Sequence, residues 1–152
     1  TELLPGPLWR WMRVTPRWVP RFYDTVRDAM TGVPGSYMVS RAAFAADLKR
    51  ESDGDVLLLS GEDVAGFVRV QILDARVGYV RMIGRRPDFR GIGLGPLLLG
   101  KALERLEAMG ARRLALDVSS TNRAALELYR MFGFTIIQEV PVYRGKRPSD
   151  AV

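Results

Sequence analysis

The sequence predicts an α/β fold with a mixed, mostly antiparallel sheet and helices on both of its faces. Three strand-like runs joined by turns follow one another in the middle of the chain, which is typical of an antiparallel meander. A helix and a further strand come next, and this order implies a parallel crossover at the end of the meander. At 152 residues the chain has the length of one domain, and we expect residues 1–152 to form it.

A strand and two helices are expected before the meander. Trp9–Val14 is predicted to be a strand, and Arg17–Met30 a helix, because its apolar residues recur at helical spacing. Glycine and proline in Thr31–Ser36 break the chain. A second helix is expected from Ser40 or Arg41 to Arg50, with Ser40 as its N-cap.

The remaining elements are expected in the order strand, strand, strand, helix, strand, helix, strand. They span Val56–Leu59, Ala65–Leu73, Val77–Ile83, Pro96–Met109, Leu114–Val118, Asn122–Met131 and Phe134–Tyr143. Gly110 ends the first of these two helices. Residues 145–152 are expected to form a frayed tail.

The composition excludes several kinds of chemistry. Hydrophobic residues make up 47% of the chain and charged residues 26%, which favours a folded globular protein. The chain has neither cysteine nor histidine, so disulfides, thiol nucleophiles, Ser-His-Asp catalysis and Cys or His metal sites are excluded, and we expect no metal. No apolar run approaches the ~20 residues of a membrane span. Proline and arginine interrupt residues 3–14 too often for a signal peptide, so we expect a cytoplasmic protein.

A glycine-rich loop, Arg90-Gly91-Ile92-Gly93-Leu94-Gly95, separates a predicted strand from a predicted helix. Glycines at alternate positions leave backbone N–H groups open at the start of a helix, where the helix dipole favours negative charge. The four arginines at positions 81, 85, 86 and 90 outnumber the single acid, Asp88, just before the loop. This pattern indicates a phosphate cradle, although similar loops also serve as plain turns.

A second pattern lies on the following helix. It consists of Asn122, Ala125, Tyr129, Gly133 and Phe134. Together with Arg90, Gly93 and Gly95, these positions resemble the GNAT superfamily of acyl-CoA-dependent N-acetyltransferases, whose phosphate loop runs Gln/Arg-x-x-Gly-x-Gly/Ala. The resemblance covers residues 77–134 well and the rest of the chain in element order. It implies a sheet that splays between its fourth and fifth strands, with CoA in the gap.

The resemblance also implies a reaction and the residues that carry it. An acetyl or other acyl group would pass from acetyl-CoA to a primary amine by direct attack, and Tyr129 would be the catalytic residue that protonates the departing thiolate. The CoA-binding residues would be Ile83, Gly84 and Arg85 through their backbone, Arg90, Gly91, Ile92, Gly93, Leu94, Gly95 and Pro96 at the pyrophosphate, and Asn122 at the pantetheine arm.

Two positions depart from the family pattern, and two others have alternative structural roles. Arg85 stands where the family usually has valine, and Pro96 where it commonly has a small hydroxyl residue. Proline removes one N–H donor from the cradle. Asn122 can equally cap its helix, as its neighbours Ser120 and Thr121 can, while an aromatic ring at helical spacing, such as Tyr129, can belong to the core.

The general base and the acceptor stay open at this point. Histone-acetylating relatives use a glutamate near the position of Val77, which cannot take a proton. Asp117 is the best-placed carboxylate, but strand alternation also predicts that it faces outward, and we name no base. The net charge of +6, without an acidic cluster near the presumed cleft, disfavours polycationic acceptors. We therefore expect a small-molecule amine or a protein N-terminus.

Three alternatives were compared with this interpretation. A dinucleotide-binding unit needs a third glycine where the chain has Leu98. A nucleic-acid binder would show an RNP motif, a helix-turn-helix or zinc-ligand spacing, so no nucleic-acid partner is expected. The same fold could instead serve as a non-catalytic acyl-CoA sensor or a degenerate partner domain. We expect no membrane partner, and a monomer or a homodimer.

Overall fold

The computed structural model describes residues 4–33 and 36–141. Its sheet has five strands in sequence order: β1 (Trp9–Arg13), β2 (Asp55–Ser60), β3 (Asp63–Ile72), β4 (Val77–Arg85) and β5 (Arg113–Leu116). Neighbouring strands are antiparallel except for β4 and β5, which are parallel. The predicted mixed sheet is confirmed.

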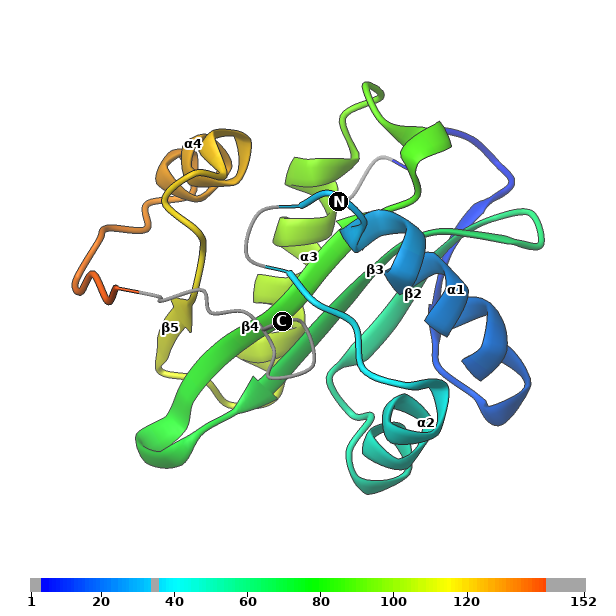
Figure 1. Cartoon of the computed structure of the whole chain (residues 1–152), viewed down its shortest axis with the longest axis horizontal. Coiled ribbons are helices and arrows are strands. Elements are labelled where there is room, and N and C mark those ends of the chain that lie inside the picture. The colour runs from blue at the N-terminus through cyan, green and yellow to red at the C-terminus, as the bar shows by residue number, and fades with distance from the viewer. Residues whose placement is uncertain (1–3, 34–35, 142–152) are drawn as a thin grey trace, which may run out of the picture.

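Helices cover both faces of this sheet, as predicted (Figure 1). α1 (Val19–Met30) and α2 (Arg41–Arg50) lie on one face, and α3 (Leu94–Ala108) lies on the other. α4 (Arg123–Met131) lies beyond β5, away from α1 and α2. No helix in the described part of the chain is long and apolar enough to cross a membrane.

The central strands are buried on both faces, so they carry continuous apolar runs rather than an alternation. In β2, Leu57 and Leu59 pack in the core under α1 and α2, while Val56 and Leu58 pack in the core under α3. Phe67 of β3 is fully buried on the α1 side. Two apolar cores thus hold the sheet rigidly between its helices.

A buried charge network fastens α2 to the sheet. Arg69 of β3 is only 5% exposed; its Nε donates to Asp55 Oδ1 at 2.9 Å and its Nη2 to Asp47 Oδ2 at 2.7 Å. Arg81 of β4 donates from Nη2 to the same Asp47 oxygen at 2.9 Å. Because a buried guanidinium must be paired, these contacts fix the position of α2 over β3 and β4.

The sheet opens between β4 and β5. The two strands pair only from Val77 opposite Arg113 to Val80 opposite Leu116. β5 ends there, while β4 continues to Arg85 and stays paired with β3 on its other side. Residues 81–85 of β4 therefore have an edge that β5 leaves free, and the splay implied by the resemblance is present.

Several predicted boundaries need correction. α3 begins at Leu94 rather than Pro96, because Gly93 ends the loop in a left-handed conformation (φ 81°) and caps the helix. β5 ends at Leu116 rather than Val118. The strand predicted over Phe134–Tyr143 is wrong for residues 134–141, which form none. A segment with strand propensity forms a strand only where it can pair with the edge of a sheet. Residues 134–141 do not pair with one, and Ile137 is 92% exposed. Residues 142–152, including the predicted tail, lie outside the described part.

Candidate functional site

The glycine loop presents open backbone at the start of α3. Gly91 and Gly93 have φ of 80° and 81°, a region that disfavours residues with a side chain. A Cβ added at either position would meet nothing within 4 Å, so no side chain of the described residues closes over these two positions. Leu94 is buried in the α3 core and anchors the loop, whereas Ile92 is 52% exposed and offers only its backbone.

In the first turn of α3, Gly95 faces α4 and the end of β4. A Cβ on Gly95 would lie 3.5 Å from Leu128 Cδ2 of α4 and 4.0 Å from Arg85 Nη1 of β4. Pro96 is the third residue of the helix and lacks an N–H. The donors left at this helix start are those of Gly93, Leu94 and Gly95, which suits an anionic phosphate.

Two of the four arginines before the loop are neutralised. Arg81 is paired with Asp47 at 2.9 Å, and Arg86 Nη2 with Asp88 Oδ2 at 3.1 Å. The side chains of Arg85 and Arg90 form no hydrogen bond or ion pair with any residue that the structure describes. Uncompensated positive charge near the loop therefore comes from Arg85 and Arg90.

The backbone of β4 beside the opening is held in place by packing on both faces. Ile83 packs into the α3 core. On the opposite face a Cβ at Gly84 would come within 2.7 Å of Met30 Cε and 2.8 Å of Phe67 Cζ, so only glycine fits there. This packing keeps the free edge of residues 83–85 straight, and an extended ligand arm can pair with its backbone.

Asn122 is a helix cap. Its Oδ1 accepts a hydrogen bond from the backbone N–H of Ala125 at 3.2 Å, which is the N-cap arrangement for α4. Of the capping candidates that the sequence offered, Asn122 is therefore the one that caps α4. Its amide NH₂ has no partner among the described residues and can still reach a ligand.

Tyr129 lies on α4 one residue after Leu128, which contacts the start of α3. Its ring packs edge-on against Phe134, with 6.1 Å between centroids. Burial raises the pKa of Tyr129, so its phenol stays protonated at neutral pH. Within residues 4–33 and 36–141 its hydroxyl has no hydrogen-bond partner. A protonated hydroxyl without a partner is available to a ligand.

The structure adds a hydrogen-bonded pair at the point where β4 and β5 part. Tyr79 Oη of β4 donates to Asp117 Oδ2 at 2.9 Å. Burial and the hydrogen bond to Asp117 raise the pKa of Tyr79 to about 12, so this phenol remains a donor. The sequence did not point to Tyr79, while Asp117 is exposed, as strand alternation predicts. The pair depends on strand register, which the sequence did not provide: Tyr79 lies opposite Ala115, and Asp117 follows two residues later.

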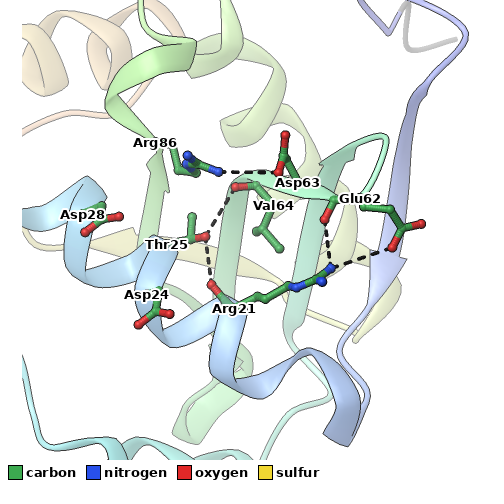
Figure 2. A pocket seen from close by; sticks show the side chains of 8 residues that line it. All are labelled: Arg21, Asp24, Thr25, Asp28, Glu62, Asp63, Val64 and Arg86. Atoms are coloured by element: carbon green, nitrogen blue, oxygen red, sulfur yellow. Dashed lines mark hydrogen bonds and ion pairs between the residues drawn. The ribbon is translucent and has the colours of Figure 1, made fainter.

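A separate polar pocket of about 350 Å³ lies on the α1 face of the sheet (Figure 2). Its charged lining comprises Arg21, Asp24 and Asp28 of α1, Glu62 of the β2–β3 turn, Asp63 at the start of β3, and Arg86. Figure 2 shows Arg21 directed at Glu62 and Arg86 at Asp63. The expectation from the sequence concerned the cleft between the fourth and fifth strands, whereas these acids gather at a different place from positions far apart in the sequence.

The model of the acetyltransferase (GNAT) family matches residues 19–134. This chain belongs to the GNAT family. A mycothiol acetyltransferase of Corynebacterium glutamicum is 33% identical over 110 residues, which cover 72% of this chain and 38% of that protein. The chain thus spans less than half the length of this curated relative.

Solved structures agree with the family assignment at the level of the fold. The ribosomal-protein-S18-alanine N-acetyltransferase of Escherichia coli matches with a TM-score of 0.69 and 24% identity, covering 84% of this chain and 77% of that one. The aminoglycoside N-acetyltransferase AAC(6′)-Iy in complex with CoA matches with a TM-score of 0.72 and 19% identity, covering 95% and 100%.

Proposed function

We propose that this GNAT-family chain transfers an acetyl group from acetyl-CoA to a primary amine of a small molecule or of a protein N-terminus. The observation that carries the proposal is the opening between β4 and β5. It brings the free edge of β4, the glycine loop at the start of α3 and the Tyr129 helix to the same region.

Three groups of residues would hold acetyl-CoA. The N–H groups of Gly93, Leu94 and Gly95 would bind the pyrophosphate, with Arg90 adding positive charge. The free backbone edge of residues 83–85 would pair with the pantetheine arm, and the Asn122 amide would contact the same arm. The open space around Gly91 and Gly93, which no side chain in the described part of the chain fills, supports this assignment.

The Tyr79–Asp117 pair would bind and deprotonate the acceptor amine. The carboxylate of Asp117 attracts a protonated amine and takes one proton from it, while Tyr79 stays protonated and orients the carboxylate. The neutral nitrogen then forms a bond to the acetyl carbon as the carbon–sulfur bond breaks, and Tyr129 donates its proton to the departing thiolate. The acylated nitrogen gives its surplus proton to water, which also takes the proton held by Asp117 and returns one to Tyr129.

The names of the relatives support both kinds of acceptor. One is a mycothiol acetyltransferase and another acts on the alanine of a ribosomal protein. At the opening of this chain, Asp47 neutralises Arg81, so the carboxylate of Asp117 faces an approaching ammonium without strong repulsion. The cytoplasmic location and the monomeric or homodimeric state stay predictions from the sequence.

Release of free thiol from acetyl-CoA in the presence of an amine panel tests the function. We expect turnover with a primary amine and a loss of about 10²–10⁴-fold in kcat/KM for Asp117→Asn, typical of a removed general base. Asp53→Asn, an exposed carboxylate paired with Arg13 at 3.7 Å, is the matched control. If acetyl-CoA binds but no amine gives turnover, the chain is the non-catalytic acyl-CoA sensor instead.

A further inference from the structure

The two residues that depart from the family pattern, Arg85 and Pro96, both lie near the start of α3. We propose that the side chain of Arg85 binds the pyrophosphate of CoA and replaces the backbone N–H donor that Pro96 removes from the loop. This inference rests on the proposed function, but it assigns to the Arg85 guanidinium a role that the sequence analysis gave only to its backbone.

The first observation is that the Arg85 side chain extends toward the start of α3. Arg85 is the last residue of β4, and its Nη1 lies 4.0 Å from the position of a Cβ built on Gly95. Gly95 immediately precedes Pro96 in the first turn of α3. The guanidinium therefore lies beside the N–H donors of the helix start, at the point where one donor is missing.

The second observation is that the Arg85 guanidinium has no partner among the described side chains. Arg85 is only partly exposed, and nothing in the described part of the chain pairs with it. Its neighbour Arg86 is equally part-exposed but contacts Asp88 at 3.1 Å and Asp63 at 3.9 Å. A part-buried cation left unpaired next to a positive helix end is unfavourable unless an anion binds there.

The chemistry of the guanidinium fits a phosphate group. Arginine presents several N–H donors in a planar fork that matches two phosphate oxygens at once, so it supplies more than the single bond lost at Pro96. Because Nη1 lies at the helix start, we assign it to the pyrophosphate rather than to the 3′-phosphate of CoA.

Calorimetric titration with CoA tests the assignment. Arg85→Leu is expected to weaken CoA binding about ten- to a hundredfold, the range of a charge-assisted hydrogen bond. Arg86→Leu, the adjacent ion-paired arginine, should bind CoA within about twofold of the parent. Pro96→Ser restores an N–H, so it should recover much of the lost affinity in the Arg85→Leu background and add little in the parent.

A second titration with 3′-dephospho-CoA separates the two phosphate sources. Binding to the pyrophosphate predicts the same loss for Arg85→Leu with either ligand. A loss that vanishes with 3′-dephospho-CoA would overturn the pyrophosphate assignment. Equal affinity of parent and Arg85→Leu would overturn the inference while leaving the proposed function intact, and a parent that does not bind CoA would overturn both.

Discussion

Removing the hydroxyl of Tyr129 distinguishes a catalytic role of this residue from a packing role. Tyr129→Phe keeps the ring contact with Phe134 and deletes only a hydroxyl that has no partner in the described chain. We expect the melting temperature and the affinity for CoA to stay near those of the parent. Turnover should fall by about 10²–10⁴-fold, as for a lost general acid. Turnover within a small factor of the parent would show that another group protonates the thiolate.

Gly95 allows the cradle to be tested with little strain. A Cβ at this position has ordinary contacts, the nearest at 3.5 Å, whereas Gly93 has φ of 81° and any side chain there strains the backbone. We expect Gly95→Asp to weaken CoA binding strongly, because its carboxylate repels the pyrophosphate. An acid in the first turn also favours the helix by about 0.3–1 kcal/mol, so the fold should not lose stability.

Gly95→Ala is the matched control for the charge. It adds the Cβ without the carboxylate and should bind CoA much better than Gly95→Asp does. Urea unfolding of both variants checks that the fold survives. Equal CoA affinity of the parent and a folded Gly95→Asp would remove the loop from the binding site.

At the scale of elements, Asp47 determines where α2 lies. Burial raises the pKa of Asp47, but hydrogen bonds and charges from Arg69 and Arg81 outweigh it, so the pKa lies below its usual value. A lowered pKa means that the contribution of Asp47 to stability is present above the unfolded-state pKa of about 3.9. That contribution is lost as the pH falls through the lower folded-state pKa.

Asp47→Asn tests this anchoring role. We expect it to lower the free energy of unfolding at pH 7 by about 1–3 kcal/mol, because two guanidinium groups lose a charged acceptor. The variant should also lose less stability than the parent between about pH 5 and pH 2.5. Asp53→Asn, whose carboxylate is exposed, should change neither quantity. Urea titrations at the two pH values measure both effects, and identical acid dependence of Asp47→Asn and parent would contradict the anchor.

Within single elements, the sequence predicted what short-range signals specify. Ser40 caps α2 by accepting from the N–H of Ala43 at 3.1 Å, as expected, and the loop glycines lie at a helix start. The boundary of β5 was less accurate, because alternating apolar residues continue past the last pair of the ladder, Val80 opposite Leu116. Local patterns thus identify an element, whereas its last residue depends on the neighbouring elements with which it pairs.

For the whole molecule, the sequence pattern predicted the order of the elements and the family resemblance implied the opening in the sheet, but neither predicted the contacts across the sheet. Arg69 with Asp55, Arg81 with Asp47 and Tyr79 with Asp117 join residues 14 to 38 positions apart. Such pairs depend on strand register and helix placement, which periodicity does not determine. The same limit explains the wrong C-terminal strand: apolar alternation shows strand propensity, whereas pairing requires an available edge.

Transfer of a labelled acetyl group is the most direct test of the account as a whole. The protein is incubated with isotope-labelled acetyl-CoA and a panel of primary amines, including peptides with free N-termini, and all species are then analysed by mass spectrometry. Direct attack at the opening between β4 and β5 predicts the label on the nitrogen of an acceptor amine, none on the protein as an intermediate, and far less product with Asp117→Asn. Tight binding of acetyl-CoA with no label on any amine, or with the label held covalently by the protein before transfer, would contradict it.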